Sequence, residues 1–157
     1  MLKTLRGGKE PTKGSKYSAA IDLYAQDDFI MEVGETRIIP LGVCICKDEI
    51  YKYLSVNSFF DTEEKTTKIL NDFMSCHYLQ LEPRSSIRAK GIISCTGIID
   101  IDYKDEIKII LHNFSGEQFI INMHDKIAQI MLQKHKTWIL GIETEDERVG
   151  GFGSSGK

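Results

Sequence analysis

The stretch GIISCTGIIDIDYKDEIKIILHNF, residues 91–114, decides the fold. Apolar and polar residues alternate along most of it, and they do so again in HYLQLEP (77–83) and EQFIINM (117–123). A period of two places one face of a strand on a core and the other face in water. The alternation therefore predicts antiparallel strands. Many short strands with turns between them predict an all-β fold, a β-barrel or jelly roll.

The same pattern extends toward both ends of the chain. AAIDLYA (19–25), FIMEV (29–33) and TRIIPLGVCIC (36–46) each have about the length of a strand. KIAQIMLQ (126–133) fits a strand or a helix by periodicity alone, and its β-rich neighbours favour a strand. Residues 1–17 are polar and rich in glycine, so they predict a flexible lead-in, with structure starting near Ser18.

Residues 47–78 interrupt this rhythm and form an insertion. Asp61 is a candidate N-cap with Glu64 three positions later, and four apolar residues follow at helical spacing: Ile69, Leu70, Phe73 and Met74. This pattern predicts a short amphipathic helix near 61–74. The insertion is either a surface decoration or a contact surface for an unknown partner.

Composition limits the class of protein. The chain has 157 residues, of which 41% are hydrophobic and 27% charged, as expected of one soluble domain. It has no run of 18 apolar residues and no signal-like start, so we expect a cytoplasmic protein, or also a nuclear one if the source is eukaryotic, with no membrane contact. The net charge of −3 argues against a broad surface for nucleic acid. The four cysteines form no CxxC pair, so we expect buried free thiols and no zinc module.

Two stretches carry candidate chemistry. Asp100, Asp102 and Tyr103 crowd a strand-to-turn edge, where a carboxylate can orient and deprotonate a water molecule; the alternative is a solvated turn. If the strand continues, both acids share a face and Tyr103 points the other way, unless a turn re-aims it. PRSSIRAKG (83–91) combines three basic residues with two hydroxyls, which predicts either an anion site or the basic start of a helix.

The last residues, TEDERVGGFGSSGK (144–157), offer nothing from which to build a core. They predict either a disordered end or an arm that closes over a phosphate ligand, because glycine amides approach phosphate closely.

Five stretches in this order resemble the ordered motifs of the trimeric dUTP diphosphatases (dUTPases): AAIDLYA (19–25), PRSSIRAKG (83–91), TGIIDIDYKDEI (96–107), HDKIAQI (124–130) and GGFGSSG (150–156). The resemblance implies a distorted jelly-roll domain over residues 1–146, with residues 147–157 as a flexible arm that closes over the active site. It implies a homotrimer whose active sites draw residues from more than one subunit. The implied reaction is hydrolysis of dUTP to dUMP and pyrophosphate by attack of water on the α-phosphate. The enzyme would keep uracil out of DNA and supply dUMP for dTMP synthesis. Mg²⁺ would be held through the substrate phosphates and water, with no direct protein ligand.

The resemblance also assigns roles by position. Asp100 matches the acid that activates water, Tyr103 the ring against deoxyribose, and Asp22 an outer-shell contact of the metal. The phosphate contacts match Arg84, Ser85, Ser86 and Gln129. The uracil hairpin and its neighbours match Ser94, Ile98, Ile99 and Lys108. In the arm, Phe152 matches the aromatic ring over the base, and the phosphate contacts match Arg148, Gly153, Ser154 and Ser155.

The chain departs from the family pattern at three places. Ala20 and Ile21 replace a glycine and an aromatic residue before Asp22, Lys104-Asp105 replaces Arg-Gly, and the arm is one residue short between Arg148 and Phe152. The shorter arm bears on whether Arg148 reaches the phosphates.

Two other functions compete with dUTP hydrolysis. A dCTP deaminase, which shares the fold, would carry a glutamate ten residues after Asp100, where this chain has Ile110, and the motif of the zinc deaminases is missing. A non-catalytic interaction protein on the same fold would use residues 47–78. Retention of Asp100, Tyr103 and Arg84 together favours an enzyme.

Overall fold

The alternating stretches form strands, as the sequence predicts. The computed structural model describes residues 1–57, 63–95 and 97–142. Its elements, in order, are β1 (Leu2–Thr4), β2 (Thr12–Lys13), β3 (Ile21–Tyr24), β4 (Phe29–Met31), β5 (Thr36–Ile45), α1 (Lys47–Asn57), α2 (Glu63–Met74), β6 (His77–Pro83), α3 (Ser85–Arg88), β7 (Ile92–Ile93), β8 (Gly97–Asp100), β9 (Glu106–Asn113), β10 (Phe119–Ile121), β11 (Lys126–Lys134) and the 3₁₀ helix η1 (Thr137–Leu140).

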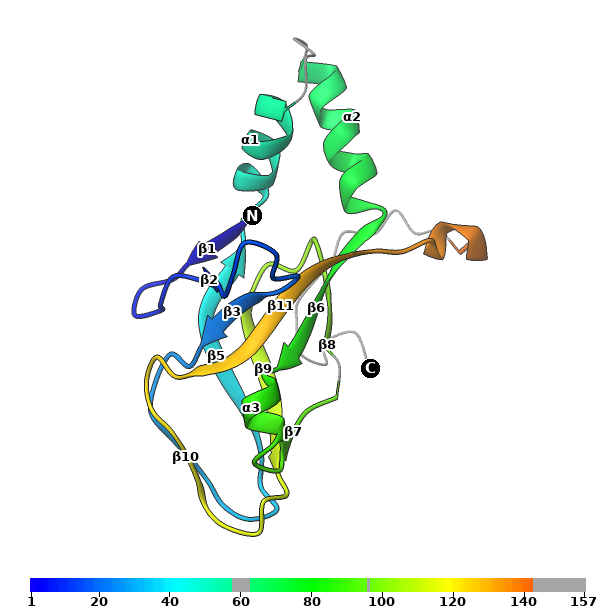
Figure 1. Ribbon diagram of the computed structural model, residues 1–157. Helices are drawn as coiled ribbons and strands as arrows, with labels where there is room; N and C mark the ends of the chain where they lie inside the picture. Colours follow the sequence, from blue (N-terminus) through cyan, green and yellow to red (C-terminus); the bar gives the residue numbers. More distant parts are fainter. Residues whose placement is uncertain (58–62, 96, 143–157) are drawn as a thin grey trace.

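The strands make three antiparallel sheets that enclose one core (Figure 1). Their orders are β1-β5-β9-β7, β2-β3-β11-β6-β8 and β10-β4. Strands distant in the sequence lie side by side, which is the connectivity of a jelly roll. Alternation fills the core: Ile107, Ile109 and Leu111 of β9 are at most 2% exposed. Burying each such side chain contributes about 1.5–3 kcal/mol. The segment 126–133 is a strand, as predicted.

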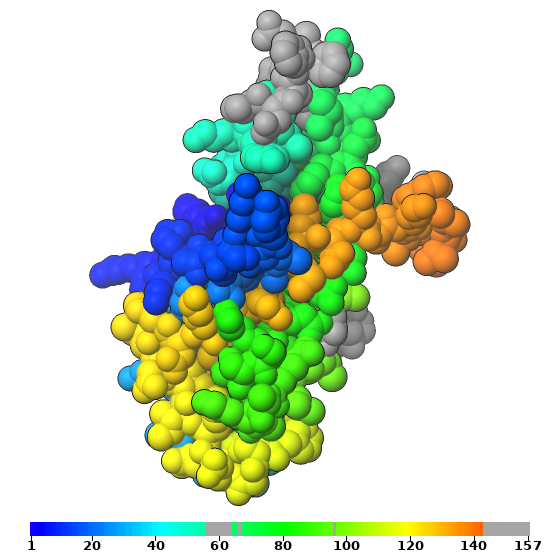
Figure 2. Space-filling model, viewed as in Figure 1, coloured from blue at the N-terminus to red at the C-terminus, as the bar shows by residue number. Residues whose placement is uncertain are grey.

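The insertion contains two helices, although the sequence predicts one. Helix α2 matches the predicted 61–74 helix, whose N-cap candidate Asp61 lies outside the described residues. The sequence did not predict helix α1 because, among its described side chains, Ile50 and Leu54 alone pack on the core at helical spacing, and its tyrosines favour strands. Ile50 is 3% exposed, so the end of the helical pair α1 and α2 nearest the sheets belongs to the core. The rest of the pair projects away from the sheets (Figures 1 and 2).

The prediction of a flexible lead-in over residues 1–17 is wrong. β1 pairs with β5 in the register Leu2↔Ile45, and β2 pairs with β3, so ordered structure begins well before Ser18. Gly8 is required by packing: a Cβ there would lie 2.2 Å from the carbonyl oxygen of Gly42. Residues 1–17 have few apolar side chains, so the sequence predicts no strand there. β1 is nevertheless held by backbone pairing to residues about forty positions away.

The cysteines are free, as predicted, but they are not buried. Cys44, Cys46 and Cys76 are partly exposed and Cys95 is exposed. In the part of the chain that the structure describes, no helix has the length and apolar character needed to cross a membrane.

Candidate active site

Three neighbouring strands bring Asp22, Gln129 and Glu82 into one row. Gln129 of β11 lies opposite Asp22 of β3 on one side and opposite Glu82 of β6 on the other. Residues directly opposite one another project to the same face of a sheet. Asp22 is 6% exposed and Glu82 is 8% exposed, so the row places two buried carboxylates on either side of one amide. Buried carboxylates need charged or hydrogen-bonding partners.

Asp22 has two cationic partners. The Arg84 guanidinium donates to Asp22 Oδ1, and Lys126 Nζ lies 3.2 Å from Asp22 Oδ2. The Arg84 backbone N–H donates to the carbonyl oxygen of Ile127 at 3.1 Å, which ties the end of β6 to β11. We call the set of Asp22, Glu82, Gln129, Arg84, Arg88 and Lys126 the charged face.

A β-bulge in β11 brings Lys126 to this face. The register between β11 and β3 shifts between Lys126 and Ala128. Ile127 and Ala128 are consecutive and both completely buried, which a regular strand would not allow. After the shift Lys126 lies opposite Tyr24, on the same side of the sheet as Asp22.

The segment after β6 is a single helical turn, α3. Arg84 occupies its N-cap position without a side-chain cap, and Ile87, 8% exposed, anchors it to the core. Ser85 and Ser86 are exposed at the start of the turn. Arg88 at its other end forms an ion pair with Glu82. The helical interpretation of this stretch is therefore correct, and the turn also presents the hydroxyls and guanidinium groups that an anion site requires.

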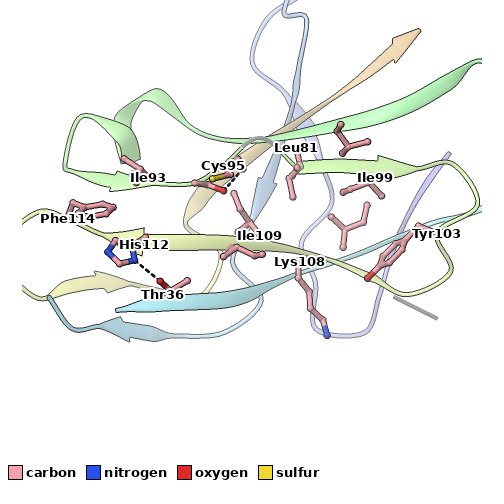
Figure 3. A pocket seen from close by; sticks show the side chains of 15 residues that line it. Thr36, Leu81, Ile93, Cys95, Ile99, Tyr103, Lys108, Ile109, His112 and Phe114 are labelled. Carbon is pink, nitrogen blue, oxygen red and sulfur yellow. Dashed lines mark hydrogen bonds between the residues drawn. The ribbon is translucent and has the colours of Figure 1, made fainter. Parts of the chain in front are cut away.

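A cavity of about 710 Å³ lies between β8 and β9, along the segment that the resemblance assigns to the uracil hairpin (Figure 3). Its lining includes the five described residues that the family resemblance assigns to the base and sugar: Ser94, Ile98, Ile99, Tyr103 and Lys108. Such a volume suits a small molecule, and an apolar lining with few polar groups is typical of such sites. We call this space the hairpin cavity.

The far end of the hairpin cavity was not predicted. Ile93, His112 and Phe114 gather there, away from Tyr103 (Figure 3). The Thr36 hydroxyl lies 2.6 Å from His112 Nδ1, and the Phe114 ring centroid is 3.9 Å from that of His112. No sequence motif marks these residues, because they come from three separate strands or their ends.

Asp100 ends the strand that borders the cavity. A turn follows at once, closed by the Tyr103 backbone N–H, which donates to the Asp100 carbonyl oxygen at 3.1 Å. The turn re-aims Tyr103, so that its ring is 8% exposed and its hydroxyl donates to the Glu106 carbonyl oxygen at 3.3 Å. The Asp100 side chain is exposed, as a group that meets water and substrate must be.

The charged face and Asp100 lie at different ends of β6. Tyr78 is opposite Asp100, whereas Glu82, four residues later, is opposite Gln129. At about 3.3 Å per residue this places them roughly 13 Å apart along the strand. Asp100 therefore projects to the same face of the sheet as Glu82, at the other end of β6, whereas Leu81 projects to the opposite face and lines the hairpin cavity.

The described residues contain no cluster for a metal ion: no group of three or more His, Cys, Asp or Glu side chains among them could hold one. The predicted arm residues lie outside the described part of the chain: Arg148, Phe152, Gly153, Ser154 and Ser155. The sequence predicts no role for Glu82 or Lys126, and it includes Arg88 only among the basic residues of 83–91. A signal for Glu82 is an acidic residue at the end of a half-buried strand with two arginines close behind it.

Known proteins of one family match this chain. The dUTPase family model matches residues 63–156. The deoxyuridine 5'-triphosphate nucleotidohydrolase of Candida glabrata is 31% identical over 156 residues, which cover 96% of this chain and 90% of that protein.

Two solved structures share the fold. A mutant dUTPase of Staphylococcus bacteriophage 80alpha, solved with dUpNHpp, superposes with a TM-score of 0.65 at 19% identity and covers 100% of this chain and 98% of the other. A mutant dUTPase from phage phi11 of S. aureus, reported with a structural Mg(II) ion, has a TM-score of 0.62 at 18% identity, covering 98% of both chains. By the match of sequence model, relative and fold, the chain belongs to the dUTPase family.

Proposed function

We propose that this protein is a dUTP diphosphatase, which hydrolyses dUTP to dUMP and pyrophosphate. The observation that carries the proposal is the hairpin cavity, whose lining collects the residues assigned to base and sugar beside the strand that ends in Asp100. Membership of the family and the name of the relative from Candida glabrata support the same substrate. In this role the enzyme would act in the cytoplasm on free nucleotide.

The segment around β8 that matches the family's uracil hairpin is suited to select uracil. Backbone N–H and C=O groups of the hairpin would pair with the base, and cytosine would present a donor where uracil presents an acceptor. A buried polar group left unpaired costs about 1–3 kcal/mol. Tyr103 is buried and held at both its backbone and its hydroxyl, so its ring offers a fixed surface to deoxyribose. A rigid ring excludes a 2′-hydroxyl better than a mobile one.

Asp100 would act as the general base. Its exposed carboxylate would orient a water molecule, take its proton and direct the oxygen to the α-phosphate. Cleavage of the bond between the α-phosphorus and its bridging oxygen releases pyrophosphate.

The charged face would hold the phosphates. Arg84 and Gln129 would contact phosphate oxygens, with the hydroxyls of Ser85 and Ser86 beside them. Both Asp22 oxygens already have cationic partners, so Asp22 fits a role in the outer shell of Mg²⁺ and not that of a direct ligand. Bound through the substrate phosphates, Mg²⁺ would neutralise developing charge.

A homotrimer would bring the separated groups together. Ile38 and Ile110 lie opposite each other and are 49% and 45% exposed, which is an apolar pair on an outer sheet face. Trp138, Ile139 and Leu140 of η1 are 66%, 61% and 70% exposed on a projection from the body (Figure 2). Exposed apolar clusters of this kind mark interfaces between subunits. Asp100 of one subunit would then serve the charged face of another.

The reaction is tested by incubating the purified protein with each deoxynucleoside triphosphate and Mg²⁺ and measuring pyrophosphate and ammonia. Pyrophosphate from dUTP alone is the expected result. Ammonia from dCTP would instead assign the protein to the deaminases, and no product from any nucleotide would favour the non-catalytic alternative.

Shared sites are tested by mixing two inactive variants. Asp100→Asn and Arg84→Gln chains are unfolded together and refolded at equal concentration. If each site takes Asp100 and Arg84 from different subunits, about a quarter of the sites in random trimers regain both residues. If one chain supplies both residues, the mixture stays inactive.

A further inference from the structure

We propose that the ion pair between Glu82 and Arg88 is a positioning device that holds the α3 turn, with Ser85 and Ser86, in place for the substrate phosphates. The inference rests on the proposed function, because it concerns the phosphate contacts of the same site. Neither residue was assigned a role by the family resemblance.

Glu82 is held from two directions. Its side chain is 11% exposed; Arg88 donates to Oε2, and the Gln80 side-chain amide donates to Oε1 at 3.0 Å. A carboxylate with both oxygens engaged has little rotational freedom. Arg88 reaches it from the last residue of α3, although its own side chain is 50% exposed. The pair therefore fixes the end of the turn to β6.

The opposite end of the turn is fixed in the same way. Arg84, the N-cap residue of α3, reaches the buried Asp22 on β3. The two carboxylates flank Gln129 in one row across the sheet. Two ion pairs therefore clamp one helical turn across the strand that carries Gln129, and the two serine hydroxyls lie between the clamps.

A turn of four residues requires such support. One helical turn is unstable by itself, because nucleation is costly and few hydrogen bonds repay it. The backbone bonds from Arg88 N–H to the Arg84 oxygen (3.0 Å) and from Ala89 N–H to the Ser85 oxygen (2.9 Å) are the ones the clamps protect. Ile87 supplies the apolar anchor beneath them. Burying Glu82 adds little net stability, since a buried ion pair roughly balances its desolvation, so its effect is on geometry.

The test measures steady-state kinetics for dUTP in Arg88→Gln, Arg88→Lys, Glu82→Gln and the double variant Glu82→Gln/Arg88→Gln. We expect Arg88→Gln to raise KM about tenfold with kcat changed less than about twofold, because ground state and transition state lose the same phosphate contacts. Arg88→Lys should recover part of the loss. The double variant should be no worse than the more affected single variant, because both remove one interaction.

The matched control is Arg37→Gln, which removes an ion pair with Glu35; neither residue lines the hairpin cavity or belongs to the charged face. Glu35 accepts a hydrogen bond from the Glu32 backbone N–H and another from Arg37, and these bonds lower its pKa. The kinetics of Arg37→Gln should match those of the unmodified protein.

An unchanged KM in Arg88→Gln, or fully additive effects in the double variant, would overturn the proposal.

Hydrogen exchange separates this inference from the proposed function. The amides of Arg88 and Ala89 should exchange faster in Arg88→Gln than in the unmodified protein or in Arg37→Gln. If the unmodified protein hydrolyses no nucleotide, the proposed function fails, yet faster exchange still supports the clamp. Equal exchange in all three proteins refutes it.

Discussion

Replacing Asp22 with Asn should destabilise the protein by removing the carboxylate that links β3 to the α3 turn and β11. Asparagine keeps the size of the side chain, so no cavity forms. It removes the charge, and its amide nitrogen presents a second donor to Arg84 and Lys126, which are donors themselves.

The magnitude follows from the exposure of the partners. A hydrogen bond to a charged group contributes about 1.5–3 kcal/mol. The Arg84 contact, in which the Arg84 side chain is 31% exposed and the Asp22 side chain 8%, should contribute about 2 kcal/mol. Lys126 is 47% exposed, so its contact resembles a surface pair and contributes about 0.5 kcal/mol. At about 2–4 °C per kcal/mol, Asp22→Asn should lower Tm by about 5–10 °C.

Thermal unfolding followed by circular dichroism measures this, with Lys126→Met as the control variant. That variant loses the half-exposed contact to Asp22 and a more distant one to the Tyr24 ring, whose centroid is 5.9 Å from Nζ, so Tm should fall by about 1–2 °C. Equal losses of Tm in the two variants would refute the reasoning, because the more buried Arg84–Asp22 contact would then contribute no more stability than the exposed Lys126–Asp22 contact. An unchanged Tm in Asp22→Asn would refute it as well.

The remaining predictions concern activity. Asp100→Asn should reduce kcat about 10²- to 10⁴-fold while binding of dUpNHpp stays near normal; ordinary turnover would remove Asp100 as the base. Deleting residues 147–157 should lower kcat/KM for dUTP about 10- to 100-fold without changing Tm, and unaltered kinetics would contradict the arm's role. Joining Leu54 to Leu70 by a short linker trims the outer part of the helical pair but keeps its buried base, so activity and Tm should persist. A loss of activity there would assign the insertion a part in catalysis.

The sequence predicts those parts of the fold in which one face of a strand is buried. β9 shows this best, since its buried apolar residues, Ile107, Ile109 and Leu111, recur at every second position as the pattern predicts. The pattern fails where backbone pairing or close packing decides. β1 has three residues and gains its place by pairing with β5, and Gly8 is present because a side chain would strike Gly42. Helix α1 escapes prediction for another reason, since two apolar side chains among its described residues, Ile50 and Leu54, are too few to mark an amphipathic helix.

The site follows the same division. The hairpin residues are close in sequence, and the structure collects them around one cavity, so a local motif was sufficient to find them. The charged face depends on contacts between distant strands. Asp22 and Arg84 are 62 positions apart, and Lys126 reaches Asp22 only after the bulge in β11 changes the side on which it projects. No spacing rule in a single sequence contains a bulge of this kind.

The charges of the charged face explain how a chain of net charge −3 could hold a triphosphate. Arg84, Arg88 and Lys126 supply three positive charges, and Asp22 and Glu82 supply two negative ones, which leaves one net positive charge. That is less than a triphosphate carries in negative charge, so the charged face is better matched to a nucleotide whose phosphates are already partly neutralised, as they are in a complex with Mg²⁺. A surface with more free lysines and arginines would attract any polyanion, nucleic acid included. Cations held by buried carboxylates are fixed in position instead, so they favour a ligand whose phosphates and metal arrive in the matching arrangement.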